Sequence, residues 1–157
     1  MNIFKNSSTC RASIIVFPLL VSACAHQASE DQGSIVPLER ASIEAVLYDY
    51  FEGTSVENPE QLRRAFHSDF NLYSVRDDGS LRVWNGQDYI SNFEVGQTNT
   101  REGKIIAIDI ENDVASAKAE ILIPGSRVFT DYFLLAKYEG QWRIVQKSYT
   151  SRRLSEP

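Results

Sequence analysis

The feature that most constrains this fold is a set of very short connections after Gly103. Four strand-like segments there are separated by turns of three residues or fewer, at 111–113, 124–126 and 139–140. Glycine, asparagine and aspartate in these turns are typical of sharp chain reversals. A parallel crossover needs about a dozen residues, so we predict an antiparallel meander. Its strands are 104–110, 114–123, 127–138 and 141–150.

Helical patterns come before this meander. Apolar side chains in the segment 39–52 recur at i, i+3, i+4, i+7 and i+8, which predicts a helix with one buried face. The members of this face are Ile43, Val46, Leu47, Tyr50 and Phe51. Asn58 and Pro59 then provide an N-cap and a first-turn proline for a short helix that ends near Phe66.

A predicted hairpin and a third helix complete the domain. Alternating segments at 70–75 and 81–84 flank a turn at 77–79, and 88–93 has apolar side chains on one side. Helices that precede a meander are typical of α+β rather than α/β proteins.

The first 24 residues have a different character. Lys5 and Arg11 are their only charges, and 12–23 is mostly apolar, which indicates the hydrophobic region of a signal peptide. A membrane-spanning helix needs about 20 apolar residues, so this segment is too short to span a bilayer.

The end of this segment, Leu20-Val21-Ser22-Ala23-Cys24, resembles the bacterial lipoprotein box, with Val21 where leucine is most frequent. The resemblance implies cleavage before Cys24, a lipid on its thiol and attachment to a membrane. Because Ala25 follows in place of aspartate, it implies the periplasmic side of an outer membrane in a two-membrane bacterium. The alternative is ordinary cleavage at 23–25, which gives a soluble periplasmic protein. The expected divisions are a signal peptide at 1–23, a polar tether at 24–38, a domain at 39–150 and a tail at 151–157.

Charge and motif content argue against several classes of function. Lys and Arg total 16 against 21 Asp and Glu, and this net charge of −5 argues against nucleic-acid binding. Two histidines and two cysteines do not form a zinc-ligand spacing, and glycine-rich phosphate loops and Gly-x-Ser-x-Gly elbows are missing from the sequence. We therefore expect neither a metal nor a cofactor. The basic residues Arg143, Lys147, Arg152 and Arg153 are interpreted as a solvated strand face and tail.

The order of these elements resembles the nuclear transport factor two-like superfamily. The residues that carry the resemblance are Phe66-His67-Ser68-Asp69, Asp131-Tyr132-Phe133 and the segment 140–145, over about 39–149. Within the superfamily, the chain is similar to the putative lumazine-binding family and to polyketide-cyclase-like relatives. The resemblance implies a cystatin-like cone, in which a strongly curved antiparallel sheet wraps around about three helices. It also implies a pocket at the open end, near Tyr50, His67, Asp69, Asp131 and the last strand.

The register of the last two strands bears on that pocket. A two-residue turn at 139–140 leads by counting to a pair between Phe133 and Gln146. The same count pairs Asp131 with Ser148, so these four side chains share a face. A carboxylate on an apolar face needs a partner or a solvated pocket. A bulge in the hairpin would reverse this register.

Two residues are candidates for acid–base chemistry. Asp131 is a candidate pocket acid or base, or else it binds backbone donors or a basic side chain at the sheet end. His67 is a second candidate base, or else it stabilises the end of the preceding helix, with Asp69 opening the next strand. The ligand-binding candidates, each with core packing or strand pairing as the alternative, are Tyr50, Trp84, Phe133, Trp142, Gln146 and Ser148.

These observations lead to two hypotheses about function. The first is a lipid-anchored envelope protein whose cone domain binds a small apolar or aromatic molecule without catalysis, or forms a homodimer or partner contact through its sheet. The second is an enzyme of the isomerase, cyclase or dehydratase type, in which His67 or Asp131 moves a proton.

Overall fold

The computed structural model describes residues 28–154, and it describes side chains from Val36 onward. The predicted signal peptide at 1–23 and the predicted lipid-bearing Cys24 lie outside the described residues. The elements are α1 (Ala28–Ser55), α2 (Pro59–Ala65), β1 (Phe66–Val75), β2 (Leu81–Asn85), α3 (Gly86–Ser91), β3 (Glu102–Glu111), β4 (Val114–Ile123), β5 (Arg127–Tyr138) and β6 (Gln141–Arg153). The predicted α+β class is confirmed. None of the described helices has the length and apolar character needed to cross a bilayer.

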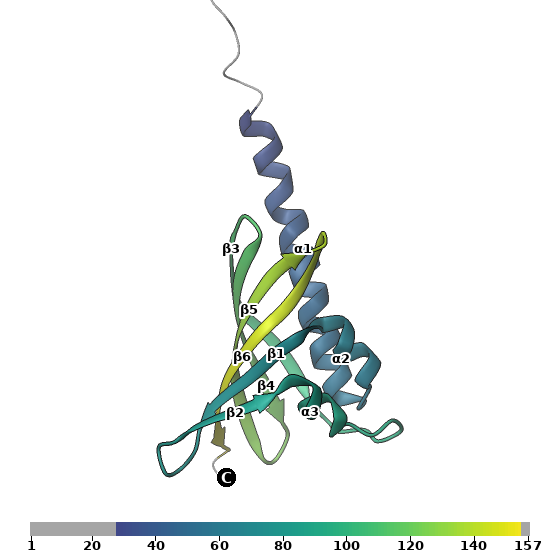
Figure 1. Ribbon diagram of the computed structural model, residues 1–157, viewed down its shortest axis with the longest axis vertical. Coiled ribbons are helices and arrows are strands. Elements are labelled where there is room, and N and C mark those ends of the chain that lie inside the picture. The colour runs from purple at the N-terminus through teal and green to yellow at the C-terminus, as the bar shows by residue number, and fades with distance from the viewer. Residues whose placement is uncertain (1–27, 155–157) are drawn as a thin grey trace, which may run out of the picture.

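The strands form one sheet in the order β2-β1-β6-β5-β4-β3. The predicted meander is confirmed, because β3, β4, β5 and β6 each pair antiparallel with the next. The sequence pattern did not predict that β1 pairs with β6 in parallel. Figure 1 shows the sheet curving around the lower half of α1, with α2 and α3 near the end of that helix.

Helix α1 is longer than predicted. It begins at Ala28 rather than at Glu39, so it runs through much of the segment 24–38 that was predicted as a tether. The tether was predicted because the segment 26–37 is polar and uncapped. Pro37 lies inside the helix, where it cannot donate a backbone hydrogen bond. The predicted apolar face of the helix is buried throughout.

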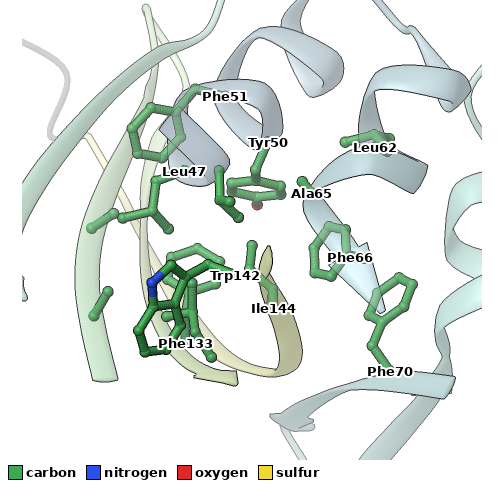
Figure 2. Close-up of a cluster of buried hydrophobic side chains, with 14 of the residues drawn as sticks. Leu47, Tyr50, Phe51, Leu62, Ala65, Phe66, Phe70, Phe133, Trp142 and Ile144 are labelled. Carbon is green, nitrogen blue, oxygen red and sulfur yellow. The ribbon is translucent and has the colours of Figure 1, made fainter. Parts of the chain in front are cut away.

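The core fills the space between α1 and the concave face of the sheet. Figure 2 shows Leu47 and Tyr50 of α1 facing Phe133, Trp142 and Ile144 of β5 and β6. The sheet approaches the helix so closely that a Cβ atom on Gly103 would lie 2.2 Å from the Phe51 ring. At the turn between β5 and β6, the Glu39 carboxylate accepts hydrogen bonds from Lys137 Nζ at 2.6 Å and Trp142 Nε1 at 2.5 Å. These bonds attach α1 to the tip of the hairpin, and they lower the pKa of Glu39.

The predicted register of β5 and β6 is correct only near their turn. Tyr138 pairs with Gln141, but a bulge then leaves Val145 as an extra residue, since Leu135 pairs with Ile144 and Leu134 pairs with Gln146. Such bulges bend a strand, and they occur where a sheet curves strongly. Beyond the bulge, every side chain of β6 lies on the face opposite to the predicted one.

Candidate functional site

The bulge brings two oppositely charged side chains into the concave face. Asp131 of β5 is 1% exposed and Lys147 of β6 is 5% exposed. Lys147 Nζ donates to Asp131 Oδ2 at 3.1 Å. The predicted pairs of Asp131 with Ser148 and of Phe133 with Gln146 are wrong, because Asp131 lies opposite Tyr149 and Phe133 lies opposite Lys147. Of the alternatives for Asp131, the pair with a basic side chain is the one observed.

Tyr50 closes this pair into a triangle. Its hydroxyl donates to Asp131 Oδ2 at 2.7 Å, and Lys147 Nζ donates to the hydroxyl oxygen at 2.7 Å. Burial and the charge of Asp131 raise the pKa of Tyr50 well above its ordinary value, so the phenol is neutral. Burial lowers the pKa of Lys147, but Asp131, Tyr89 and Tyr149 together raise it by more, so the pKa is raised. Lys147 is therefore a cation at neutral pH.

Aromatic rings surround this cation. Lys147 Nζ lies 4.9 Å from the ring centres of Tyr50 and Tyr149, and 5.5 Å from that of Tyr89. Cations are attracted to the faces of aromatic rings at such distances. The rings and Asp131 together replace much of the hydration that Lys147 loses on burial. Asp131 Oδ1, by contrast, is buried with no hydrogen-bond partner among the described residues.

Lys147 lies at the wall of a cavity of about 300 Å³. The cavity lies between α3, the loop that follows it and the halves of β5 and β6 beyond the bulge. Its lining is mostly aromatic and consists of Glu57, Leu72, Trp84, Tyr89, Asn92, Phe93, Arg101, Phe129, Lys147 and Tyr149. Among the described residues, Lys147 is the member of the triangle that lines this cavity, while Tyr50 and Asp131 lie behind it.

Two further charged residues line the cavity. Arg101 precedes β3, and its Nε is buried without a hydrogen-bond partner in the described part of the chain. The carboxylate of Glu57 is already engaged, since its Oε1 accepts from Asn99 Nδ2 and its Oε2 accepts from the Glu94 amide. Within residues 28–154, His, Cys, Asp and Glu side chains do not gather into a group that could hold a metal.

The loop that carries Arg101 is tied to the end of α1. The backbone amide of Asn99 donates to the backbone carbonyl of Ser55 at 2.7 Å, and the Ser55 hydroxyl donates to the backbone carbonyl of Asn99 at 2.8 Å. The position of Arg101 therefore depends on the same helix that supplies Tyr50.

The aromatic residues predicted from the sequence divide between cavity and core. Trp84 lines the cavity, where its ring meets that of Tyr89 edge to face at 5.4 Å. Phe133 is buried with its ring 5.3 Å from that of Tyr50, and Trp142 is buried at the tip beside Glu39. Phe133 and Trp142 are therefore core residues.

The remaining predicted residues lie elsewhere. Gln146 and Ser148 line a hollow on the outer face of the sheet, together with Lys118 and Tyr132. This corrects their predicted place in the pocket, and the cause is the bulge at Val145.

His67 is not brought to the cavity. It lies within β1 rather than at a helix end, its ring meets Tyr138 edge to face at 5.2 Å, and its Nδ1 accepts from the Asp69 amide at 3.2 Å. The hollow at this point is shared with Arg63 and Arg143. The two residues predicted to move protons, His67 and Asp131, thus belong to separate parts of the molecule.

Sequence reasoning missed most residues of the site, among them Lys147, Tyr89 and Arg101. Lys147 was assigned to a solvated strand face, which the bulge reverses. Burial raises the pKa of the Tyr89 phenol, while the charges of Lys147 and Arg101 lower it by less. The alternation of Lys147 with Tyr149 was visible in the sequence, but the face that they share was not.

Comparison with known proteins supports this fold. A family model described as putative lumazine-binding matches residues 38–150. A solved NTF2-like protein of unknown function from Shewanella baltica is 29% identical, with a TM-score of 0.67, and the match covers 73% of this chain and 94% of that one. One from Silicibacter pomeroyi is 22% identical, with a TM-score of 0.66 and coverage of 74% and 98%. A putative scytalone dehydratase from Novosphingobium aromaticivorans is 17% identical, with a TM-score of 0.58 and coverage of 76% and 90%. A search of curated proteins finds no match.

Proposed function

Because the chain belongs to the putative lumazine-binding family of NTF2-like proteins, we propose that it binds a small, flat aromatic molecule in the cavity beside Lys147 without transforming it. The observation that carries this proposal is the aromatic lining of the cavity, made by Trp84, Tyr89, Phe93, Phe129 and Tyr149. A volume of about 300 Å³ is at the small end of ligand sites, which suits one or two fused rings. Lumazine, which gives the family its description, is such a two-ring heterocycle.

The state of the buried triangle supports binding rather than catalysis. A general base must be unprotonated and must reach the substrate. Lys147 reaches the cavity but is protonated, whereas the Asp131 carboxylate lies behind it and already binds Lys147 and Tyr50. Tyr50 and Tyr89 are neutral phenols. The triangle thus provides a fixed positive charge and hydrogen-bond donors.

The second candidate is a proton-transfer enzyme of the isomerase, cyclase or dehydratase type. It is favoured by Asp131 Oδ1, which is buried without a partner among the described residues. The structural likeness to a putative dehydratase adds some support. In this alternative, Lys147 would move aside so that Asp131 could accept a proton.

Binding is tested by titrating the purified domain with lumazine and following fluorescence. We expect saturable binding that Trp84→Ala weakens about tenfold, because stacking on one aromatic ring contributes about 1–3 kcal/mol. Tyr132→Ala, which removes an exposed ring from the outer face of the sheet, is the matched control and leaves affinity unchanged. Lack of saturable binding by any flat aromatic compound, or equal losses in the two variants, would reject the proposal.

Catalysis is tested by native mass spectrometry of protein purified from its host, which identifies any retained molecule. We expect that molecule to be recovered unchanged after release and renewed incubation with the protein. Conversion by the natural chain but not by Asp131→Asn would instead support the enzyme.

We propose further that the chain is exported and attached to a membrane by a lipid on Cys24, in a two-membrane bacterium the outer membrane. This proposal rests on the lipoprotein-like segment that ends at Cys24. Cys24→Ser should abolish membrane attachment and the added mass of the acyl groups. If the variant fractionates with membranes like the natural chain, the anchor is wrong, whatever the cavity binds.

A further inference from the structure

The cavity lining contains one positive charge that forms no ion pair among the described residues. Lys147 is balanced by Asp131 at 3.1 Å. Glu57 is the acidic residue of the lining. One of its carboxylate oxygens accepts a hydrogen bond from the Asn99 side chain, and the other accepts one from the backbone amide of Glu94. The described residues provide no salt bridge for Arg101. The guanidinium of Arg101 therefore forms no ion pair with a described residue, although the Glu57 carboxylate lines the same cavity.

Arg101 is partly buried, and the cost of lacking a partner falls on its Nε atom. Its Nε is shielded from solvent and has no acceptor among the described residues. A buried polar group without a partner loses its hydration with no compensation, and the loss is larger for a charged group. Such a group is a reasonable place for a ligand atom, since a ligand that supplies the acceptor recovers this energy.

The surroundings of Arg101 indicate what the acceptor would be attached to. Arg101 and Tyr89 both line the cavity, and the charge of Arg101 lowers the pKa of the Tyr89 phenol. Tyr89 in turn contacts Trp84 and Phe93 edge to face, at ring-centre distances of 5.4 and 5.1 Å. A ring among these aromatic side chains would thus have its substituent near the guanidinium.

We propose that the molecule bound here is a planar aromatic anion, an aromatic acid that is ionised at neutral pH, and that Arg101 binds its acidic group. This inference rests on the proposed function, because it names the class of molecule that the same cavity takes. Arg101 provides planar, charge-assisted hydrogen bonds that match a carboxylate. The ammonium of Lys147 is a second positive group in the lining, and its bond to Asp131 fixes its position.

The test compares two probes that differ in one group. 2-Naphthoate and 2-naphthamide have the same rings and nearly the same shape, but only the first is an anion. Isothermal titration of the natural protein should show at least tenfold tighter binding of 2-naphthoate. Arg101→Gln should lose that preference, with naphthoate weakened about tenfold to a hundredfold and naphthamide changed by less than about twofold, as expected for loss of a charged hydrogen bond.

Two further variants separate the local contact from the overall charge. Arg152→Gln removes a positive charge from an exposed position on β6, and it should keep the full preference for naphthoate. Arg101→Lys retains the charge without the planar fork and should keep part of the preference. A circular dichroism melt of each variant checks that the fold is intact.

The outcomes distinguish this inference from the function on which it rests. If the natural protein binds both probes equally, or if Arg101→Gln keeps the preference, the anion site is wrong and aromatic binding stands. If neither probe nor lumazine binds, the cavity is not an aromatic site and both proposals fail. Equal losses in Arg101→Gln and Arg152→Gln would mean that long-range charge, rather than contact with Arg101, sets the preference.

Discussion

Both halves of the β5–β6 hairpin have buried inward side chains, but only the half beyond the bulge includes charged ones. Next to the turn, Leu135, Trp142 and Ile144 pack against α1 and are at most 3% exposed. Beyond the bulge, Asp131 and Lys147 are almost as buried, but they are charged. Burial alone therefore does not separate core from site in this protein. The charged groups beyond the bulge mark the site.

Each half is stable for a different reason. The half next to the turn gains free energy from apolar area removed from water. The half beyond the bulge must first offset the cost of removing two charges from water, which it does through the triangle with Tyr50 and the surrounding rings. The first half tolerates small changes of shape, whereas the second depends on every partner being present.

The largest effect expected from this comparison is the cost of breaking the charged pair. Asp131→Asn and Lys147→Met should each lower the free energy of unfolding by about 3–5 kcal/mol, because each leaves a buried group unpaired. The double variant should lose less than the sum of the two, since the second change removes the group that the first left unpaired. Urea denaturation of the four proteins measures this. Additive losses would show that the two charges do not depend on each other.

A smaller loss of stability is expected for a change in the half next to the turn. Ile144→Val removes one methylene from a fully buried side chain and should cost about 1 kcal/mol. The binding of 2-naphthoate should be unchanged, because Ile144 does not line the cavity among the described residues. The same denaturation and titration experiments check both points. Asp131→Asn is the comparison, because it preserves side-chain size. If Ile144→Val lowered the free energy of unfolding by as much, the distinction between the two halves would be wrong.

The smallest expected effect is a loss of folding stability that is absent at neutral pH and develops only in alkaline solution. The ordinary pKa values of Tyr50 and Lys147 are 10.0 and 10.5, and both are raised in the folded chain. The unfolded chain then releases these protons first, so the stability is full below about pH 10 and falls as the pH rises further. Denaturation midpoints on either side of this pH should show the fall, with a shallower slope in Tyr50→Phe. An unchanged slope in that variant would mean that other groups cause it.

The sequence was sufficient for elements that local patterns define. The helical spacing from Ile43 to Phe51 identified a buried face, and the turn residues correctly placed both ends of β4 and β5. The pairing of β1 with β6 could not be predicted, because it joins segments far apart in the chain.

The site was only partly predictable. Tyr50, Trp84 and Asp131 were identified, since polar or aromatic groups in apolar patterns are visible in a sequence. Lys147 was missed because one extra residue, Val145, reverses the face on which it lies. Arg101 lies in a loop without periodicity, so no pattern indicated where its side chain would lie.

The position of β6 has a consequence for when this domain can fold. The last strand along the chain lies in the middle of the sheet, between β1 and β5. Until β6 has emerged from the ribosome, both neighbours have open edges and the lysine of the site is missing. Pairing of β1 with β6 must also close a long loop, which slows folding. We therefore expect the domain to complete its fold only after β6 has been synthesised.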